Sequence, residues 1–333
     1  MIITQTPLRI SFVGGGTDLR EFYGRAPGMV LSSAIDKYIY VVIKERFDDR
    51  IVLHYTANEI VDRVEDIRHD LIREALRLTG LSRGVEIITL ADIPSTGSGL
   101  GSSSTVTVGL LNALHALKGE QVSAEQLARE AAHIEVDVLG KPIGKQDQYI
   151  AAYGGLRKFV FRADETVENV RLPLAEDAYG TLGSRLFLHF TNITRNADEI
   201  LAEQKKNTVG KLALLQQMAG LVPQLEAALE RQDFDVLGTC LAENWALKEQ
   251  LALPISSPDI QAMVAQARAS GATGCKIAGA GGGGFLLSYV PADRQEQFLH
   301  GMASYRNLPF ALDPFGSRLV LNIRRETRFP FHP

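Results

Sequence analysis

The stretch from Asp92 to Ser104 spaces glycines and serines in a way that suits a phosphate-binding loop. Gly97, Gly99 and Gly101 alternate with other residues, which lets the backbone approach a ligand closely and adopt φ values that other residues resist. An apolar run with helical spacing starts at Val106, so the N–H groups and positive dipole end of a helix would face the loop's ligand. A plain connecting loop has the same composition, and no Gly-Lys-Ser/Thr follows the glycines as a Walker A sequence requires.

Two carboxylates after this loop are candidates for chemistry. On an ideal helix Glu135 lies about 80° from Leu127, at the rim of the apolar stripe, and Asp147 sits in a glycine-bounded break. A surface glutamate and an Asx turn explain the same two residues without any function. Phosphoryl transfer needs a nucleotide cradle, a divalent cation and a group that orients or deprotonates the acceptor hydroxyl. Because Mg²⁺ usually takes only one or two protein oxygens, a loop serine and one carboxylate would suffice.

Alternating and helical patterns predict the elements that position these residues. Residues 2–13 alternate as a half-buried strand, with Arg9 opposite the apolar row. Thr17 or Asp18 would cap the short segment through Tyr23, and Ser123 would cap another helix. Further strands are predicted at 30–43 and 51–55 as neighbours, and at 85–90, 156–161, 185–190, 272–277, 285–290 and 318–323. Further helices are predicted at 66–78, across most of 197–270 with breaks at Pro223 and 254–258, and at 294–304.

Length and composition set the class of protein. The chain has 333 residues, of which 45% are hydrophobic and 22% charged, as in an ordinary soluble protein with a sizeable core. We expect two domains, residues 1–165 and 166–333. A net charge of −4 gives no general attraction for nucleic acid or an anionic membrane. Only two cysteines occur, and we find no export signal or membrane span, so we expect a cytoplasmic protein.

Three ordered glycine motifs together resemble the GHMP kinases, the small-molecule kinase superfamily that includes galactokinase, homoserine kinase and mevalonate kinase. The motifs are Pro7 to Asp18, Pro94 to Ser104, and Lys276 to Gly284, and they extend over nearly the whole chain. Within the superfamily, Gly14 to Asp18 and Gly144 to Tyr149 most resemble the D-glycero-D-manno-heptose 7-phosphate kinases. The resemblance implies a two-domain α+β fold with the active site in the interdomain cleft, ATP as phosphoryl donor and Mg²⁺ as cofactor.

The resemblance also implies a role for each matching residue. It makes Asp147 the catalytic carboxylate and Arg9 its partner, and it makes Ser103, or its neighbour Ser102, and Glu135 the metal ligands. The residues that would bind nucleotide phosphates are Pro94, Gly97, Ser98, Gly99, Leu100, Gly101, Ser102, Ser103 and Ser104. The residues that would bind the acceptor are Gly14, Gly15, Gly16, Thr17, Asp18, Arg195, Gly281 and Gly282.

The acceptor that we expect is a small-molecule sugar phosphate. Galactokinases carry Glu-His where this chain has Gly15-Gly16, so space is left for a longer sugar whose phosphate would meet Arg195, Lys37 or Lys145. The resemblance implies phosphorylation of the anomeric hydroxyl of heptose 7-phosphate to the 1,7-bisphosphate, for nucleotide-activated heptose synthesis. The alternatives are another sugar 1-kinase, for fucose or a related hexose, and a non-catalytic binding module. The sequence is compatible with a homodimer.

Overall fold

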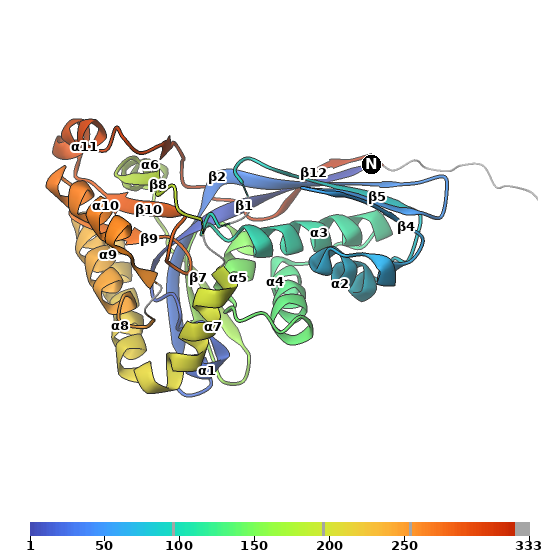
Figure 1. The fold of residues 1–333 in the computed structure, drawn as a ribbon, viewed down its shortest axis with the longest axis horizontal. Helices are drawn as coiled ribbons and strands as arrows, with labels where there is room; N and C mark the ends of the chain where they lie inside the picture. Colours follow the sequence, from blue (N-terminus) through green and yellow to red (C-terminus); the bar gives the residue numbers. More distant parts are fainter. Residues whose placement is uncertain (95–96, 195–196, 253–254, 324–333) are drawn as a thin grey trace, which may run out of the picture.

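The computed structural model describes residues 1–94, 97–194, 197–252 and 255–323. The chain forms one eight-stranded sheet and one four-stranded sheet, both flanked by helices (Figure 1). Mixed helices and sheets in this arrangement confirm the predicted α+β class.

The large sheet has the strand order β12-β1-β2-β5-β3-β4, and β2 also pairs with β6, which pairs with β7. Its strands are β1 (Ile2–Val13), β2 (Gly28–Glu45), β3 (Ile51–His54), β4 (Asn58–Val61), β5 (Val85–Ala91), β6 (Leu156–Phe161), β7 (Val167–Arg171) and β12 (Arg318–Asn322). The expectation that residues 30–43 and 51–55 form neighbouring strands is wrong, because β5 lies between them. It pairs antiparallel with β2 and parallel with β3, and the parallel connection crosses over through α2.

Helices cover one face of the large sheet, below it in Figure 1. They are α2 (Asp70–Thr79), α3 (Ser102–Lys118), α4 (Ala124–Ala132) and α5 (Gln146–Tyr153). The predicted cap of α4 is confirmed, since the Ser123 hydroxyl accepts a hydrogen bond from the Gln126 N–H at 3.1 Å. Beyond α4 the chain widens into a π-helix, η2 (His133–Val138), which holds Glu135.

The second half of the chain is built around the four-stranded sheet, with the order β11-β8-β10-β9. Its elements are α6 (Glu176–Ser184), β8 (Leu186–Phe190), α7 (Ala197–Asn207), η3 (Thr208–Lys211), α8 (Leu212–Glu230), α9 (Asp235–Lys248), α10 (Pro258–Ala269), β9 (Gly274–Ile277), β10 (Phe285–Tyr289), η5 (Ala292–Arg294), α11 (Gln295–Gly301) and β11 (Asn307–Leu308). Two short helices, α1 (Arg20–Tyr23) and η1 (Val64–Asp66), belong to the first half.

Proline acts differently at the two predicted breaks. The break at Pro223 is wrong, because α8 continues through it and its buried neighbours Val222 and Leu225 hold the helix against the core. Packing thus offsets the lost backbone hydrogen bond. Near the second break, Pro258 starts α10 after the cap Ser257, as its fixed φ favours. Residues 253–254 lie outside the described part of the chain.

Strands β1 and β2 of the large sheet connect the two halves. Their ends pack against helices of the second half, β1 against α8 and α9 and β2 against α8 (Figure 1). The last strand, β12, returns to pair with β1, and the β6–β7 hairpin spans residues 165 and 166. The domain division at this point stays a prediction. What matters for the site is that β1 passes between helices from both halves, so a residue on it can face a cleft between them.

Candidate functional site

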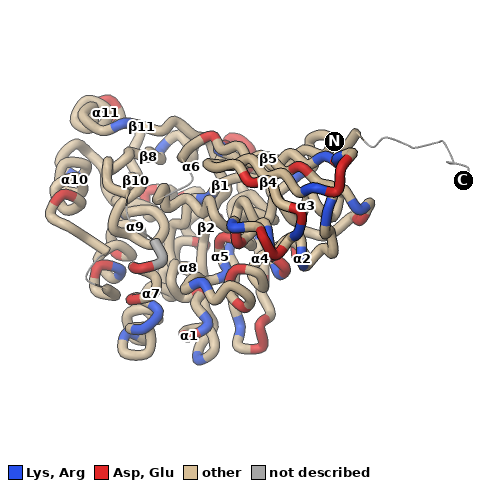
Figure 2. Tube along the Cα trace, turned by 45° about the vertical axis from the view of Figure 1, so that its right-hand side comes forward, with Lys and Arg blue, Asp and Glu red and all other residues tan. Residues whose placement is uncertain are grey.

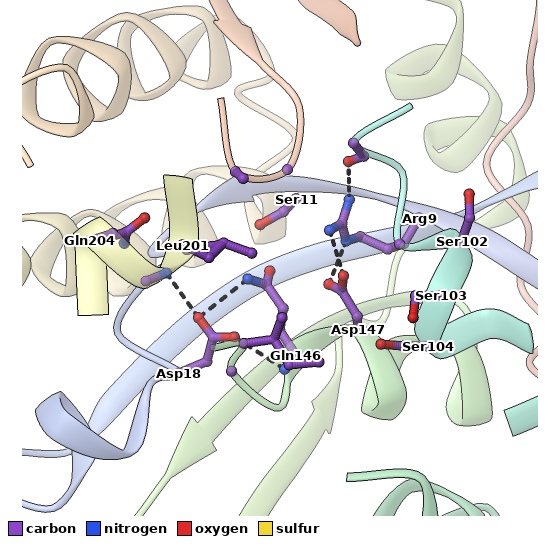
Figure 3. A pocket seen from close by; sticks show the side chains of 18 of the residues that line it. Arg9, Ser11, Asp18, Ser102, Ser103, Ser104, Gln146, Asp147, Leu201 and Gln204 are labelled. Atoms are coloured by element: carbon purple, nitrogen blue, oxygen red, sulfur yellow. Dashed lines mark hydrogen bonds and ion pairs between the residues drawn. The ribbon is translucent and has the colours of Figure 1, made fainter. Parts of the chain in front are cut away.

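A cavity of about 480 Å³ brings together residues from all three glycine motifs (Figure 3). The predicted site residues that line it are Arg9, Gly15, Gly16, Asp18, Gly97, Ser98, Gly99, Gly101, Ser102, Ser103, Ser104 and Asp147. Its wall also includes Leu201 and Gln204 of α7 and Lys248 of α9, from the second half of the chain. Segments far apart in the sequence therefore meet at one place.

Arg9 and Asp147 form a two-pronged ion pair on one side of this cavity (Figure 3). The guanidinium donates from Nε to Oδ1 at 2.7 Å and from Nη2 to Oδ2 at 2.8 Å. Its third nitrogen, Nη1, donates to the Gly99 carbonyl at 2.6 Å, which ties the pair to the glycine loop. Asp147 lies in the first turn of α5 rather than in a loop, so the helix fixes where its carboxylate points. Such bidentate geometry orients a carboxylate firmly.

The glycine loop leads into the N-terminus of α3, as the sequence predicts. Gly97, Gly99 and Gly101 all have positive φ, so these turns favour glycine. The first helical backbone bond runs from the Thr105 N–H to the Gly101 carbonyl at 3.0 Å, so the amides of 102–104 precede the hydrogen-bonded turns. A helix of 17 residues thus presents free N–H groups and its positive dipole end to the cavity. This arrangement can hold phosphate.

Ser103 and Glu135 lie together beside the loop. The Ser103 hydroxyl donates to Glu135 Oε1 at 2.8 Å, and Gln148 Nε2 donates to Oε2 at 2.6 Å. The predicted place of Glu135 at the rim of its helix is wrong: its side chain is fully buried, and burial raises the pKa of this carboxyl. A serine hydroxyl and a carboxylate oxygen 2.8 Å apart are oxygen ligands of the kind that Mg²⁺ prefers, so these two residues would hold the ion. No cluster of three His, Cys, Asp or Glu side chains offers a metal site in the described residues.

The first glycine motif divides into residues that shape the chain and residues that face the cavity. Thr17 is fully buried, and its hydroxyl donates to the carbonyls of Gly14 and Met29 at 2.8 Å. Asp18 lines the cavity and accepts from the Gly16 N–H at 2.8 Å, and burial raises its pKa. Neither Thr17 nor Asp18 caps α1, whose N-cap is Leu19, so that expectation is wrong.

Several predicted site residues lie outside the cavity wall. Those that do not line it among the described residues are Pro94, Leu100, Gly14, Thr17, Glu135, Gly281 and Gly282. Gly282 belongs to the β9–β10 hairpin and donates its N–H to the Ile255 carbonyl at 2.8 Å, while the adjacent Gly279 and Ala280 reach the cavity. Arg195 lies outside the described residues.

The lysines expected to meet the acceptor phosphate are not the ones that line the cavity. Lys37 donates to Asp36 at 2.8 Å and Lys145 pairs with Glu165, and neither lines the cavity. Lys141, Lys248 and Lys276 line it instead. Lys276 could have been found, because it stands in a short apolar strand and is the first residue of the third glycine motif. Lys248 stands at the end of an ordinary helix, and nothing in the neighbouring sequence predicts that it is buried.

The two buried lysines are held by backbone carbonyls. Lys248 Nζ donates to the Gly279 carbonyl, and Lys276 Nζ donates to the Ser11 carbonyl at 2.8 Å. Burial, with Arg9 nearby, lowers the pKa of Lys248 to about 8. Burial and the adjacent Lys248 also lower the pKa of Lys276. Ammonium groups held in this way favour an anion that would share their charge.

The cavity differs in charge from the rest of the molecule. Figure 2 shows positive and negative residues interspersed along the chain, in keeping with a net charge of −4. The charged side chains that line the cavity are Arg9, Lys141, Lys248 and Lys276 on the positive side and Asp18 and Asp147 on the negative side. A local excess of positive charge suits a polyanionic ligand inside an overall acidic protein.

The chain matches two family models. The GHMP kinases N terminal domain model matches residues 66–155, and the GHMP kinases C terminal model matches residues 225–307. In the described part of the chain no helix combines the length and apolar character needed to cross a bilayer.

Individual relatives agree with these matches. The D-glycero-alpha-D-manno-heptose 7-phosphate kinase of Campylobacter jejuni is 31% identical over 316 residues, covering 90% of this chain and 93% of that protein. The mevalonate kinase of Thermococcus sibiricus is 28% identical and covers 82% of this chain and 75% of its own. A crystal structure described as a D-glycero-D-manno-heptose 1-phosphate kinase from Bacteroides thetaiotaomicron superposes with a TM-score of 0.80 at 24% identity, covering 97% of this chain and all of that one.

Proposed function

The chain belongs to the GHMP kinases, and from this premise we propose that it is an ATP- and Mg²⁺-dependent kinase of D-glycero-D-manno-heptose 7-phosphate. It would phosphorylate the anomeric hydroxyl and release the 1,7-bisphosphate. The observation that carries the proposal is the Arg9–Asp147 pair, which touches the glycine loop through Gly99 inside a cavity with excess positive charge. The relative from Campylobacter jejuni supports the choice of sugar.

We propose that Asp147 binds the acceptor hydroxyl. Its side chain is 23% exposed and faces the cavity, so a hydroxyl group can reach it, while Arg9 holds both carboxylate oxygens in place. The carboxylate would accept the hydrogen bond of the hydroxyl and take its proton as the new P–O bond forms. A loose transition state asks little of a base, so orientation is the larger part of this role.

The donor phosphates would lie against the glycine loop and the N-terminus of α3. The amides of 102–104 point toward the cavity end of this helix, and the Ser98 and Ser102 hydroxyls lie 3.1 Å apart beside them. Ser103 and Glu135 would hold Mg²⁺, which neutralises phosphate charge and orients the phosphates when bound. This part of the site explains the donor and does not select the sugar.

Lys248 would bind the phosphoryl group during transfer. Its carbonyl partner Gly279 packs directly on the loop, since a Cβ at Gly279 would lie 2.7 Å from the Cα of Gly99. The loop carries no lysine of its own, and all three guanidinium nitrogens of Arg9 are already engaged. A primary ammonium with donors to spare therefore stands where the loop, the hairpin and the ion pair meet, and charge develops there during transfer.

An ADP-release screen over sugars and sugar phosphates tests the proposal. We expect turnover with heptose 7-phosphate and little with unphosphorylated hexoses such as fucose. Turnover confined to unphosphorylated hexoses would reject the choice of acceptor and leave the kinase assignment standing. Turnover of heptose 1-phosphate alone would reject phosphorylation at the anomeric position, because that hydroxyl is already esterified.

A further inference from the structure

The three consecutive glycines of the first motif differ in what requires them to be glycine. Gly14 and Gly16 have φ values of +86° and +104°, and a Cβ at either would overlap the Met29 carbonyl or the Gln204 amide. Gly15 is not among the positive-φ residues, and its Cβ would meet Gln146 Nε2 at 3.5 Å and Ser11 Oγ at 3.6 Å, which are ordinary contacts. The backbone therefore accepts a side chain at Gly15, and its absence leaves open space in the cavity.

Polar atoms without partners surround this space. Ser11 Oγ, Gln146 Oε1 and Gln204 Oε1 are buried and have no hydrogen-bond partner among the described residues, and all three side chains line the cavity. Ser11 is 5% exposed and Gln204 only 2%. Figure 3 shows the three side chains around one opening. Buried polar atoms are rarely left unpaired, so three of them on one cavity wall point to a ligand that completes their hydrogen bonds.

The chemistry of these groups defines that ligand. Two amide oxygens can only accept hydrogen bonds, and Asp18 beside them accepts from Gly16 N–H at 2.8 Å and Gln146 Nε2 at 3.2 Å. Two unpaired amide oxygens beside a carboxylate favour ligand groups that donate hydrogen bonds, such as hydroxyl groups. Leu201 of α7 adds an apolar surface at the same place, which suits the C–H face of a sugar.

We propose that Ser11, Gly15, Gln146 and Gln204 form a subsite that binds hydroxyl groups on the carbon chain of the acceptor, with the phosphate of the acceptor held elsewhere in the cavity. The proposal rests on the proposed function and deepens it. Gln204 comes from α7 in the second half of the chain, while Ser11 and Gly15 come from the first. The subsite therefore exists only when the two halves meet. It would select the sugar by the length of its carbon chain and by its hydroxyl groups.

Gly15→Ala is the most selective test. The folded protein accepts the methyl group, which then occupies space that the sugar needs. We expect an unchanged Tm, an unchanged KM for ATP, and a KM for heptose 7-phosphate that rises about 10-fold to 100-fold, the range for one methyl group in a binding pocket. Gly220→Ala is a matched control, because nothing lies within 4 Å of that position on α8, and it should leave both KM values unchanged.

Ser11→Ala provides a second test if Gly15→Ala disturbs the fold. It removes an unpaired hydroxyl and keeps the backbone carbonyl that accepts from Lys276. We expect a Tm at or above that of the wild type, with a KM for the sugar about 3-fold to 10-fold higher, as for one lost hydrogen bond. The sugar dissociation constant, measured by calorimetry without nucleotide, should change by the same factor.

The outcomes separate this proposal from the function on which it rests. Wild-type turnover of heptose 7-phosphate with unchanged sugar KM in both variants overturns the hydroxyl subsite alone. Absence of both turnover and binding of any sugar phosphate by the wild type overturns the two proposals together. A raised sugar KM in Gly15→Ala and in Ser11→Ala, with retained Tm and ATP KM, supports the subsite.

Discussion

The two sides of the cavity differ in the kind of hydrogen bond that they offer. On one side, Arg9, Lys248 and the N-terminus of α3 are donors with positive charge. On the other side, Asp18, Gln146 and Gln204 present acceptors (Figure 3), and the amide oxygens of the two glutamines have no partner in the described part of the chain. The difference shows how one cavity can hold two unlike parts of a reaction, because phosphates need donors and hydroxyl groups need acceptors. Changes on the donor side should lower turnover, whereas changes on the acceptor side should weaken sugar binding.

The largest effect should come from Asp147→Asn, at the border between the two sides. The amide cannot take the hydroxyl proton and loses one oxygen from the Arg9 pair. We expect kcat to fall about 10³-fold to 10⁴-fold while nucleotide and sugar phosphate still bind. Steady-state kinetics with calorimetric binding checks this, and Asp164→Asn, in an exposed turn, serves as the control. Turnover within tenfold of the wild type would remove Asp147 from the chemistry.

Arg9→Ala should follow, with a fall in kcat of about 10²-fold to 10³-fold. The change removes both bonds to Asp147 and the bond to the Gly99 carbonyl, so the carboxylate and the loop lose their link. Because the role of Arg9 lies in the transition state, kcat and kcat/KM should fall together while the circular dichroism spectrum stays native. A raised KM with normal kcat would instead make Arg9 a ground-state binding residue.

Lys248→Met should separate activity from stability. We expect kcat to fall about 10-fold to 100-fold, as for one lost charged hydrogen bond. The pKa of about 8 lies below the ordinary lysine value, so below pH 8 the folded state carries the full destabilisation of a buried ammonium. Above pH 8 the folded state loses the proton before the unfolded chain does, and wild-type stability rises. The variant should therefore have a higher Tm at pH 7, and its advantage should shrink at more alkaline pH.

The same lysine predicts the alkaline limb of the activity profile. In the wild type, kcat/KM should fall above about pH 8, because Lys248 of the free enzyme loses its charge there. Lys248→Arg, if active, should move this limb to higher pH because arginine stays protonated. Coincident pH profiles for the two proteins would show that Lys248 does not titrate in the active site.

Lys37→Met should give the smallest effect. Lys37 bonds to Asp36 and lies outside the cavity wall, so the KM for the sugar phosphate should change by less than about twofold. A larger increase would return Lys37 to the site and place the sugar phosphate outside the cavity described above.

Residue types were predictable from the sequence, and their surroundings were not. The glycine loop follows from residue spacing, Arg9, Asp147 and Asp18 follow from the resemblance to the GHMP kinases, and the strand and helix that carry the loop are confirmed. A regular helix predicts Glu135 at the rim, whereas the chain widens to a π-helix at that point, which changes the direction in which the side chain points. The separate roles of Gly15 and Gly16 depend on Gln204, which only the folded chain brings close. Lys248 was missed because a lysine at a helix end usually lies at the surface.

The most direct measurement of the central claim is a ³¹P NMR spectrum of the product formed from ATP and heptose 7-phosphate. If the cavity transfers a phosphoryl group to the anomeric hydroxyl, a second sugar phosphate signal should appear, coupled to the anomeric proton, and the 7-phosphate signal should remain. Asp147→Asn should give the starting spectrum over the same period. A new phosphate signal coupled to a proton other than the anomeric one would contradict the account. The absence of a new sugar phosphate signal from wild-type protein that consumes ATP would contradict it as well.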